Sequence, residues 1–364
     1  MDGAVSARGP RPRQCGIRIG RLPTGPRNGI GDVPGVRVGH VTVWRDEPEP
    51  PAGRGVARTG VTAIVPADPS GLVARPLPAG VAVLNGAGEL TGALEVFEWG
   101  VVETPLWLTS SMQVGRVLDG AVTALAALDP RLGADHVVLP VVGECDDSWL
   151  SEARLQQVVA EDAGRALAAA TETPEEGAVG AGTGMTCFGW KGGIGTSSRV
   201  VRSLDATLGV LVLANYGSAH ELRVDGVPVG EALAARPSRP QPAGSCIAVV
   251  VTDAPLDPAS LERVARRCGL GLARTGSVAH DGSGEIFLAL STGARRTRGT
   301  PSPAAIRAEA LDELFAATVE ATEEAVLNAL WAAPDVTGRE GRVAFGLPHE
   351  ETLALLAAAG RLHR

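Results

Sequence analysis

Residues 242–252 read Pro-Ala-Gly-Ser-Cys-Ile-Ala-Val-Val-Val-Thr, and they join a proline-rich loop to an apolar run. Residues 246–251 are all apolar, which predicts a strand buried on both faces. Residues 231–244 before it are rich in proline and arginine and predict a linker. Ser245 opens the strand directly after a glycine, so we expect a hydroxyl group where a flexible loop meets a sheet.

Apolar runs and helical patterns alternate on both sides of this junction. Runs that predict strands occupy residues 36–43, 61–65, 81–84, 106–109, 136–142, 199–203, 208–215 and 286–290. Helical patterns occupy residues 114–128, 152–170 with Ser151 as N-cap, the segment after Asp257 and Pro258, 303–333 and 348–362. This alternation predicts an α/β or α+β layered domain. Residues 1–27, rich in arginine and proline, are expected to form an arm or an edge extension.

The composition excludes several classes of protein. The chain has 364 residues, of which 45% are hydrophobic, so it folds around a large core and is not disordered. The formal net charge of −8 argues against nucleic-acid binding. No apolar run reaches about 18 residues, so no membrane span is predicted. We also expect no signal peptide, because the amino terminus lacks an apolar region.

Motifs for metals, cofactors and common nucleophiles are absent from the sequence. Five scattered cysteines without a Cys-x-x-Cys pair predict reduced thiols in a cytoplasmic protein. The glycine-dense residues 180–197 have neither the Walker spacing nor the dinucleotide spacing. There is no His-Glu-x-x-His or Gly-x-Ser-x-Gly motif, and the six histidines are far apart in sequence. No cofactor and no metal are therefore predicted.

The Gly244-Ser245 dipeptide permits a chemistry that needs none of these motifs. A serine hydroxyl can attack the carbonyl before it, and hydrolysis of the resulting ester frees an α-amine on Ser245. That amine has an ordinary pKa of about 7.7–8.0 and can serve as the base for the same hydroxyl. The chain contains 33 lysine and arginine residues, but only Lys191 is lysine, so a local lysine base is hard to supply. On spacing alone, an ordinary loop-to-strand junction is the favoured interpretation.

Segments along most of the chain resemble the DmpA-like L-aminopeptidase/D-esterase family, which includes the β-aminopeptidases. The matching segments are residues 28–43, 59–66, 85–92, 140–150, 180–199, 209–217, 242–256 and 280–292. They follow the family order, and the set as a whole is specific although each segment alone is weak. The resemblance implies an inactive precursor that cuts itself at Gly244–Ser245 into chains of residues 1–244 and 245–364.

The resemblance also implies roles for individual residues. Ser245 would be the new amino terminus and the nucleophile, and Asn215 would stabilise the oxyanion. Ser283 and Glu285 match the Ser-x-Glu/Asp element, in which the hydroxyl contacts the surroundings of the nucleophile and the carboxylate orients the new amino group. Glu144 would receive the free amino group of the substrate, so that only a chain end is accepted.

One position departs from the family pattern. The best-known members carry a tyrosine two residues after the glutamate, and here that position is Asp146, which we expect to contact substrate. An aspartate does not donate a hydrogen bond as a phenol does at neutral pH. Tyr216, the only tyrosine, lies beside Asn215 in sequence and does not occupy that position. The difference leaves open which substrates are accepted and how fast.

The fold implied by the resemblance is α+β, a four-layer αββα sandwich of the type shared with ornithine acetyltransferases. Residues 28–364 would form one catalytic domain behind an arm of residues 1–27. The activity implied is that of a self-processing serine aminopeptidase acting on peptides, amides or esters, assembled as a homo-oligomer, typically a tetramer of two-chain units. Two alternatives stay open: an acyltransferase of the ornithine-acetyltransferase type, and a binding protein that never matures.

Overall fold

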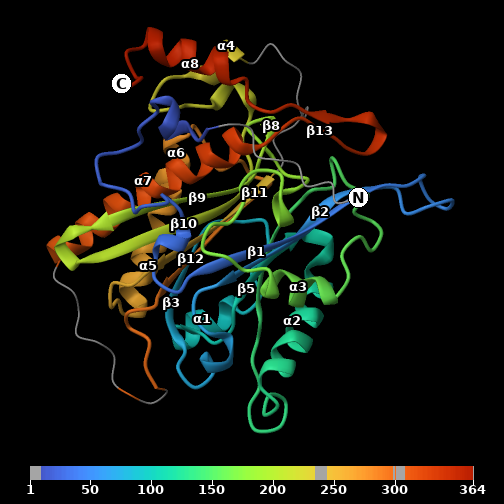
Figure 1. Ribbon diagram of the computed structural model, residues 1–364, viewed down its shortest axis with the longest axis vertical. Helices are drawn as coiled ribbons and strands as arrows, with labels where there is room; N and C mark the ends of the chain where they lie inside the picture. The colour runs from blue at the N-terminus through green and yellow to red at the C-terminus, as the bar shows by residue number, and fades with distance from the viewer. Residues whose placement is uncertain (1–9, 234–243, 298–299, 301–307, 364) are drawn as a thin grey trace.

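The computed structural model describes residues 10–233, 244–297, 300 and 308–363. Two β-sheets pack face to face, and helices cover the outer face of each sheet, as Figure 1 shows. One hydrophobic core fills the space between the sheets, and a further core lies beneath each helix layer. This arrangement confirms the α+β class and the αββα sandwich expected from the sequence.

The larger sheet has six strands in the order β4-β3-β12-β11-β10-β9. Its strands are β3 Leu77–Gly86, β4 Val101–Val102, β9 Gly193–Val201, β10 Ala206–Asn215, β11 Gly244–Thr252 and β12 Ser283–Ser291. Neighbouring strands are antiparallel except β11 and β12, which run parallel. β11 lies inside the sheet and is buried along its whole length, as its apolar sequence predicted.

The smaller sheet has four strands in the order β1-β2-β5-β6. Its strands are β1 Arg37–Asp46, β2 Val56–Val65, β5 Leu106–Ser110 and β6 Val141–Cys145. Two short ribbons stand apart from both sheets. They are formed by β7 Thr186–Cys187 with β8 Trp190–Lys191, and by β13 Val336–Thr337 with β14 Val343–Ala344.

The two helix layers differ in size. The smaller sheet is covered by α2 Val114–Leu128 and α3 Glu161–Ala168, and the larger sheet by α5 Pro258–Arg266, α6 Cys268–Arg274 and α7 Ala308–Ala332. The remaining helices of the described residues are α1 Ala93–Trp99, α4 Val229–Leu233 and α8 His349–Ala358. In the described ranges, no helix combines the length and the apolar composition that a membrane crossing requires.

Alternate side chains of β11 enter two different cores. Ile247 and Val249 face the core between the two sheets, whereas Cys246 and Ala248 face the core beneath α5, α6 and α7. Ser245 is two residues before Ile247 on the same strand, so its side chain points toward the core between the sheets. The apolar alternation of β11 thereby determines the direction of the hydroxyl group.

Several elements agree with the sequence-based prediction. The helix predicted over residues 114–128 is present with the same bounds, because its apolar positions form one face against the smaller sheet. Asp257 caps α5 by accepting a hydrogen bond from the Ser260 backbone N–H, and Pro258 is the first helical residue. The strand predicted over 136–142 begins later, since β6 starts only at Val141.

The helix predicted over residues 152–170 is wrong in its first half, because only α3 is helical. The Glu152 N–H donates to the carbonyl of Val56 at 2.7 Å, which ties the start of this segment to β2. Ser151 is not an N-cap, since its hydroxyl oxygen accepts from the Arg58 N–H at 3.1 Å. Contacts with β2 therefore override the local helical pattern.

Two predicted segments fall partly outside the described residues. The linker predicted over 231–244 overlaps α4 at its start, its residues 234–243 are not described, and Gly244 is already part of β11. The helix predicted over 303–333 corresponds to α7, which is described from Ala308 onward.

Residues 10–27 pack against the domain and do not form a separate arm. Ile19 is buried in the core beneath α7, and Arg13 forms an ion pair with Glu324 at 2.7 Å. The boundary predicted at residue 27 therefore does not separate two bodies. Residues 1–9 of the predicted arm lie outside the described part of the chain.

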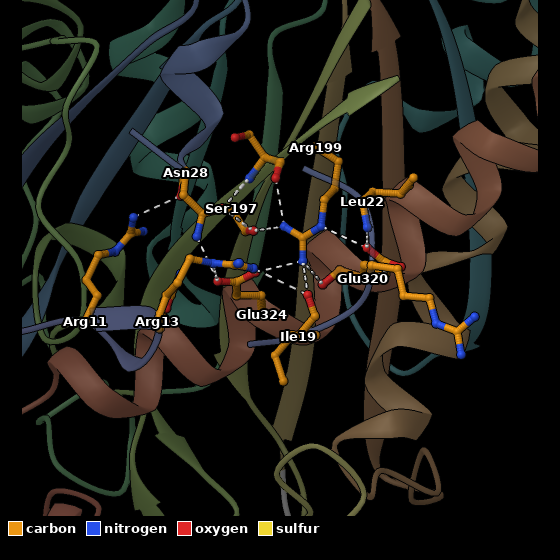
Figure 2. Close-up of polar contacts among 12 residues, drawn as sticks. Arg11, Arg13, Ile19, Leu22, Asn28, Ser197, Arg199, Glu320 and Glu324 are labelled. Atoms are coloured by element: carbon orange, nitrogen blue, oxygen red, sulfur yellow. Dashed lines mark hydrogen bonds and ion pairs between the residues drawn. The ribbon is translucent and has the colours of Figure 1, made fainter. Parts of the chain in front are cut away.

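Arg199 on β9 joins this amino-terminal segment to α7, as Figure 2 shows. Its guanidinium lies 3.0 Å from Glu320 and 2.7 Å from Glu324, and it donates to the carbonyl of Ile19 and the hydroxyl of Ser197, both at 2.9 Å. The side chains of Arg199 and Glu324 are 0% and 1% exposed, so fixed partners replace water around both charges.

Candidate active site

The start of β11 lies between the end of β10 and the start of β12. Ser245 is the antiparallel partner of Asn215 on β10 and the parallel partner of Gly284 on β12. Gly244 is in turn the partner of Ser283. The register of these strands therefore brings together residues that are separated along the chain and that the sequence predicted to form one site.

Gly244 is required by the close approach of β10. A Cβ atom at this position would lie 1.8 Å from the carbonyl oxygen of Asn215 and 2.7 Å from the Cα of Tyr216. Any side chain would push the two strands apart, so only glycine fits immediately before Ser245. The Gly244–Ser245 peptide bond, which the sequence predicts to be cut, therefore lies in a tightly packed part of the backbone.

The predicted site residues divide between the two faces of the larger sheet. Ser245 and Asn215 are paired across antiparallel strands, and each lies two residues from a side chain in the core between the sheets, Ile247 and Leu213. Strand alternation places Glu285 on the opposite face. Its carboxylate is therefore suited to contact the backbone nitrogen at the start of β11, not the Ser245 hydroxyl.

Hydrogen bonds on both ends hold the Asn215 carboxamide in one orientation. Its Oδ1 accepts from the backbone N–H of Thr186 at 2.8 Å, and its Nδ2 donates to the carbonyl of Asp146 at 2.9 Å. Asn215 is fully buried. The amide NH₂ has two N–H groups, so one remains for a further acceptor.

Glu285 is a buried carboxylate with one oxygen left for a further partner. The Ser283 hydroxyl donates to Oε1, and Oε2 has no hydrogen-bond partner among the described residues. Burial raises the pKa of Glu285 above its ordinary value, and the hydrogen bond from Ser283 opposes this effect. A buried carboxylate oxygen of this kind is stabilised when a donor or a cation pairs with it.

Glu144 on β6 is held from two sides. The Ser111 hydroxyl donates to its Oε2, and the backbone N–H of Glu89 donates to its Oε1 at 2.9 Å. The Glu144 side chain is buried, and this burial raises its pKa. Gly88 lies between this carboxylate and Gly284, since a Cβ on it would be 3.1 Å from Glu144 Oε1 and 3.6 Å from the Gly284 Cα. Glu144 therefore lies near the strand that carries Glu285.

Asp146 contributes its backbone as well as its side chain. Its carbonyl accepts from Asn215, and its Oδ1 accepts from the Ser148 N–H at 2.8 Å. Tyr216 is buried on the far side of β10 in the core beneath the helices, with its hydroxyl 3.0 Å from the Thr275 hydroxyl. The single tyrosine therefore does not replace the phenol that the family carries at position 146.

Three groups in and around the predicted site were not identified by the sequence analysis. They are the Ser111 hydroxyl on Glu144, the Thr186 N–H on Asn215, and Lys191, whose ammonium contacts the loop before Thr186. A serine and a backbone N–H carry no sequence signal of their own. Lys191 did carry a sequence signal, because it is the only lysine in the chain.

Other groups near the junction already have partners. Lys191 Nζ donates to three backbone carbonyls, and His280 Nε2 lies 2.9 Å from Glu221. Within the described ranges, no group of three or more His, Cys, Asp or Glu side chains is arranged to hold a metal ion.

Comparison with known families and proteins agrees with this geometry. The model of peptidase family S58 matches residues 28–344. A beta-peptidyl aminopeptidase of Sphingosinicella microcystinivorans is 39% identical, and the alignment covers 100% of this chain and 96% of the relative. The match therefore spans both sides of the Gly244–Ser245 junction.

Two solved structures are similar over nearly the whole chain. A beta-aminopeptidase of a Burkholderia species has a TM-score of 0.87 and 41% identity, covering 96% of this chain and 99% of that one. The L-aminopeptidase D-Ala-esterase/amidase of Ochrobactrum anthropi, described as a variant of the Ntn hydrolase fold, has a TM-score of 0.89 and 36% identity, covering 98% and 100%. The αββα architecture is thus shared with serine aminopeptidases.

Proposed function

Because the chain belongs to peptidase family S58 and is an aminopeptidase, we propose that it is made as a precursor that cuts its own Gly244–Ser245 bond. The observation that carries this proposal is the meeting of Ser245, Asn215 and Glu285 at the start of β11. Ser245 supplies a nucleophile, Asn215 supplies an amide donor, and the buried Glu285 carboxylate is suited to hold the α-amine that serves as base.

The place of Ser245 directly after Gly244 supports self-cleavage. Ser245 Oγ attacks the carbonyl carbon of Gly244, the C–N bond breaks, and the hydroxyl proton passes to the freed nitrogen. Water then hydrolyses the ester, which releases the Gly244 carboxylate and restores the hydroxyl. The 364 residues are divided into chains of 244 and 120 residues, since 364 − 244 = 120.

The mature enzyme repeats the same acyl chemistry on a substrate. The freed amine of Ser245, with an ordinary pKa of about 7.7–8.0, takes the proton of the hydroxyl as Oγ attacks the substrate carbonyl. Asn215 Nδ2 donates to the developing oxyanion. The proton moves to the leaving amine or alcohol, and water hydrolyses the acyl-enzyme. No step requires a metal or a cofactor.

Glu285 and Ser283 support the amine that catalysis depends on. The Glu285 oxygen that lacks a partner among the described residues faces the side of the sheet opposite the hydroxyl, where the amino group freed on Ser245 can donate to it. This contact holds the amine beside the hydroxyl in the position a base requires.

The mass of the purified protein and its activity test this proposal together. We expect fragments ending at Gly244 and beginning at Ser245 by mass spectrometry, and release of p-nitroaniline from aminoacyl p-nitroanilides with α- and β-amino residues. Transfer of the acetyl group from acetyl-ornithine, without hydrolysis of the anilides, would favour the acyltransferase. A chain that stays at 37.2 kDa after long incubation at pH 8 would favour a non-maturing binding protein.

Glu144 is proposed to bind the amino group of the substrate, with Asp146 beside it. Glu144→Gln keeps the shape but removes the charge that pairs with an ammonium, so KM is expected to rise about 10- to 100-fold with a smaller change in kcat. Steady-state kinetics on one anilide measures both. Glu89→Gln is the control. The hydrogen bond from the Glu89 backbone N–H to Glu144 survives this change, and only a nearby like charge is removed, so KM should change less than about twofold.

The pH dependence of KM is a second test of the proposed contact between Glu144 and the substrate amino group. Burial raises the pKa of Glu144, so it protonates at a higher pH than an ordinary glutamate. Amine binding needs the charged form, and KM of the wild type should therefore rise as the pH falls through that pKa. A KM that rises equally in Glu144→Gln would contradict the assignment.

We further propose that the substrates are small peptides, amides or esters and that the enzyme works in the cytoplasm, where its five free cysteines stay reduced. We also propose a homo-oligomer, a tetramer of two-chain units. Exposed apolar side chains on α1 support it, since Leu94 and Phe97 are 83% and 58% exposed. Analytical ultracentrifugation at several concentrations measures the assembly.

A further inference from the structure

We propose that Lys191 orients and polarises the oxyanion donor Asn215 through one shared peptide group, the peptide between Met185 and Thr186. Lys191 does not reach the reacting atoms, so it acts as a positioning residue. This inference rests on the proposed role of Asn215, and it adds a charged group to a site that otherwise consists of a hydroxyl, an amide and carboxylates.

The Lys191 ammonium is buried and fully occupied by backbone. Nζ donates to the carbonyls of Gly182 at 3.0 Å, Met185 at 2.7 Å and Gly192 at 2.8 Å, and the residue is 0% exposed. Three donated bonds match the three N–H groups of the protonated amine. All three carbonyls belong to the glycine-dense loop that carries β7 and β8 (residues 180–193).

The Met185–Thr186 peptide connects this ammonium to Asn215. Its carbonyl oxygen accepts from Lys191 Nζ and also from the Gly192 N–H at 3.0 Å. Its N–H donates to Asn215 Oδ1 at 2.8 Å. An ammonium on the carbonyl withdraws electron density from the peptide N–H, which becomes a stronger donor to Asn215. The carboxamide is polarised in turn, and its Nδ2–H becomes a stronger donor to an oxyanion.

The charged groups near Lys191 do not cancel the effect of its ammonium on these three carbonyls. Burial lowers the pKa of Lys191 to about 7, although the nearby Asp147 and Cys187 oppose this shift, so the ammonium form that the proposal requires prevails below about pH 7. Asp147 is itself buried and accepts from the Ser110 hydroxyl at 2.7 Å. Among the described residues, no carboxylate forms an ion pair with Nζ, so no contacting anion cancels its charge.

Lys191→Met tests the charge with a side chain of similar length. We expect kcat to fall about tenfold with KM nearly unchanged, because the ammonium acts on the transition state and not on the bound substrate. Thr183→Val is the matched control. It removes a buried hydrogen bond in the same loop, from Thr183 Oγ1 to the Gly180 carbonyl, that does not involve the Met185–Thr186 peptide. It should lower the melting temperature but leave kcat within about twofold.

A double-mutant cycle tests whether Lys191 acts through Asn215 or independently of it. Asn215→Ala is expected to lower kcat about 10²- to 10³-fold. In that background Lys191→Met should lower kcat less than about twofold further, because its path to the oxyanion is already broken. A tenfold loss in both backgrounds would overturn the connection. An unchanged kcat in Asn215→Ala alone would instead refute the proposed role of Asn215.

Nitrogen NMR tests the same connection without a change at Lys191, in case Lys191→Met fails to fold. Since Lys191 is the only lysine, protein grown on [¹⁵Nζ]lysine gives a single ammonium signal. An aminoacyl boronic acid, which forms a tetrahedral anion on the serine hydroxyl, should shift that signal in the wild type and not in Asn215→Ala. A signal that does not move when the boronate binds the wild type would overturn the proposal.

Discussion

Ser245→Ala is expected to yield one intact chain of 364 residues with aminopeptidase activity below about 10⁻⁴ of the wild type. The change removes both the hydroxyl that attacks the Gly244 carbonyl and the nucleophile that attacks substrate. Without cleavage, no α-amine forms on residue 245 to serve as a base. Intact mass and anilide hydrolysis measure the two losses separately.

Ser245→Cys is the control for this experiment. A thiol is also a nucleophile, so this variant should still cut the chain at the same bond, at a different rate. Before cleavage, the two variants should melt at nearly the same temperature, because they differ in one small side chain at the start of a strand whose other residues are unchanged. Fragments that end at Gly244 in Ser245→Ala would show that another group performs the cleavage.

Arg199→Met is expected to lower the free energy of unfolding by about 3–5 kcal/mol. The change leaves Glu320 and Glu324 on α7 without their buried cation, and it also removes the donor to the Ile19 carbonyl. Arg13 remains beside Glu324, but its own side chain is 28% exposed and does not fill the space of Arg199. The amino-terminal segment and α7 should therefore loosen together.

Denaturant unfolding in the Ser245→Ala background measures this cost on a single uncleaved chain. Arg266→Met is the matched control, since Arg266 pairs with Glu262 on the surface of α5 with side chains 59% and 46% exposed. That exposed pair should contribute less than about 1 kcal/mol. Equal losses for the two variants would mean that burial of the Arg199 network adds no stability. A larger loss for Arg199→Met should also increase proteolysis within residues 10–27.

The local elements of the fold were predicted well where one strong pattern acted alone. β11 is apolar along its length, the 114–128 helix has one apolar face, and Asp257 with Pro258 is a helix start that needs no distant partner. The prediction over 152–170 failed because β2 supplies a tertiary hydrogen-bond partner to backbone that local spacing assigns to a helix. Local pattern therefore decides an element only where tertiary contacts agree with it.

For the site residues too, local sequence determined one part and tertiary contacts the other. The residue types at Ser245, Asn215 and Glu285 could be identified from the sequence, chiefly through a family resemblance that family membership now confirms. Their common location could not, because it depends on which residue of β10 and which of β12 pairs with Ser245. A one-residue shift in register would have turned Asn215 to the opposite face of the sheet.

By itself the sequence determined the glycine-to-serine junction, the apolar strand behind it and the presence of a single lysine. Only the tertiary structure decided that Glu144 from the other sheet lies near this junction and that Lys191 contacts the peptide that holds Asn215. The physical reason is that hydrogen bonds between distant backbone groups have no signature in residue order. They exist only once the strands have paired and the two sheets have packed.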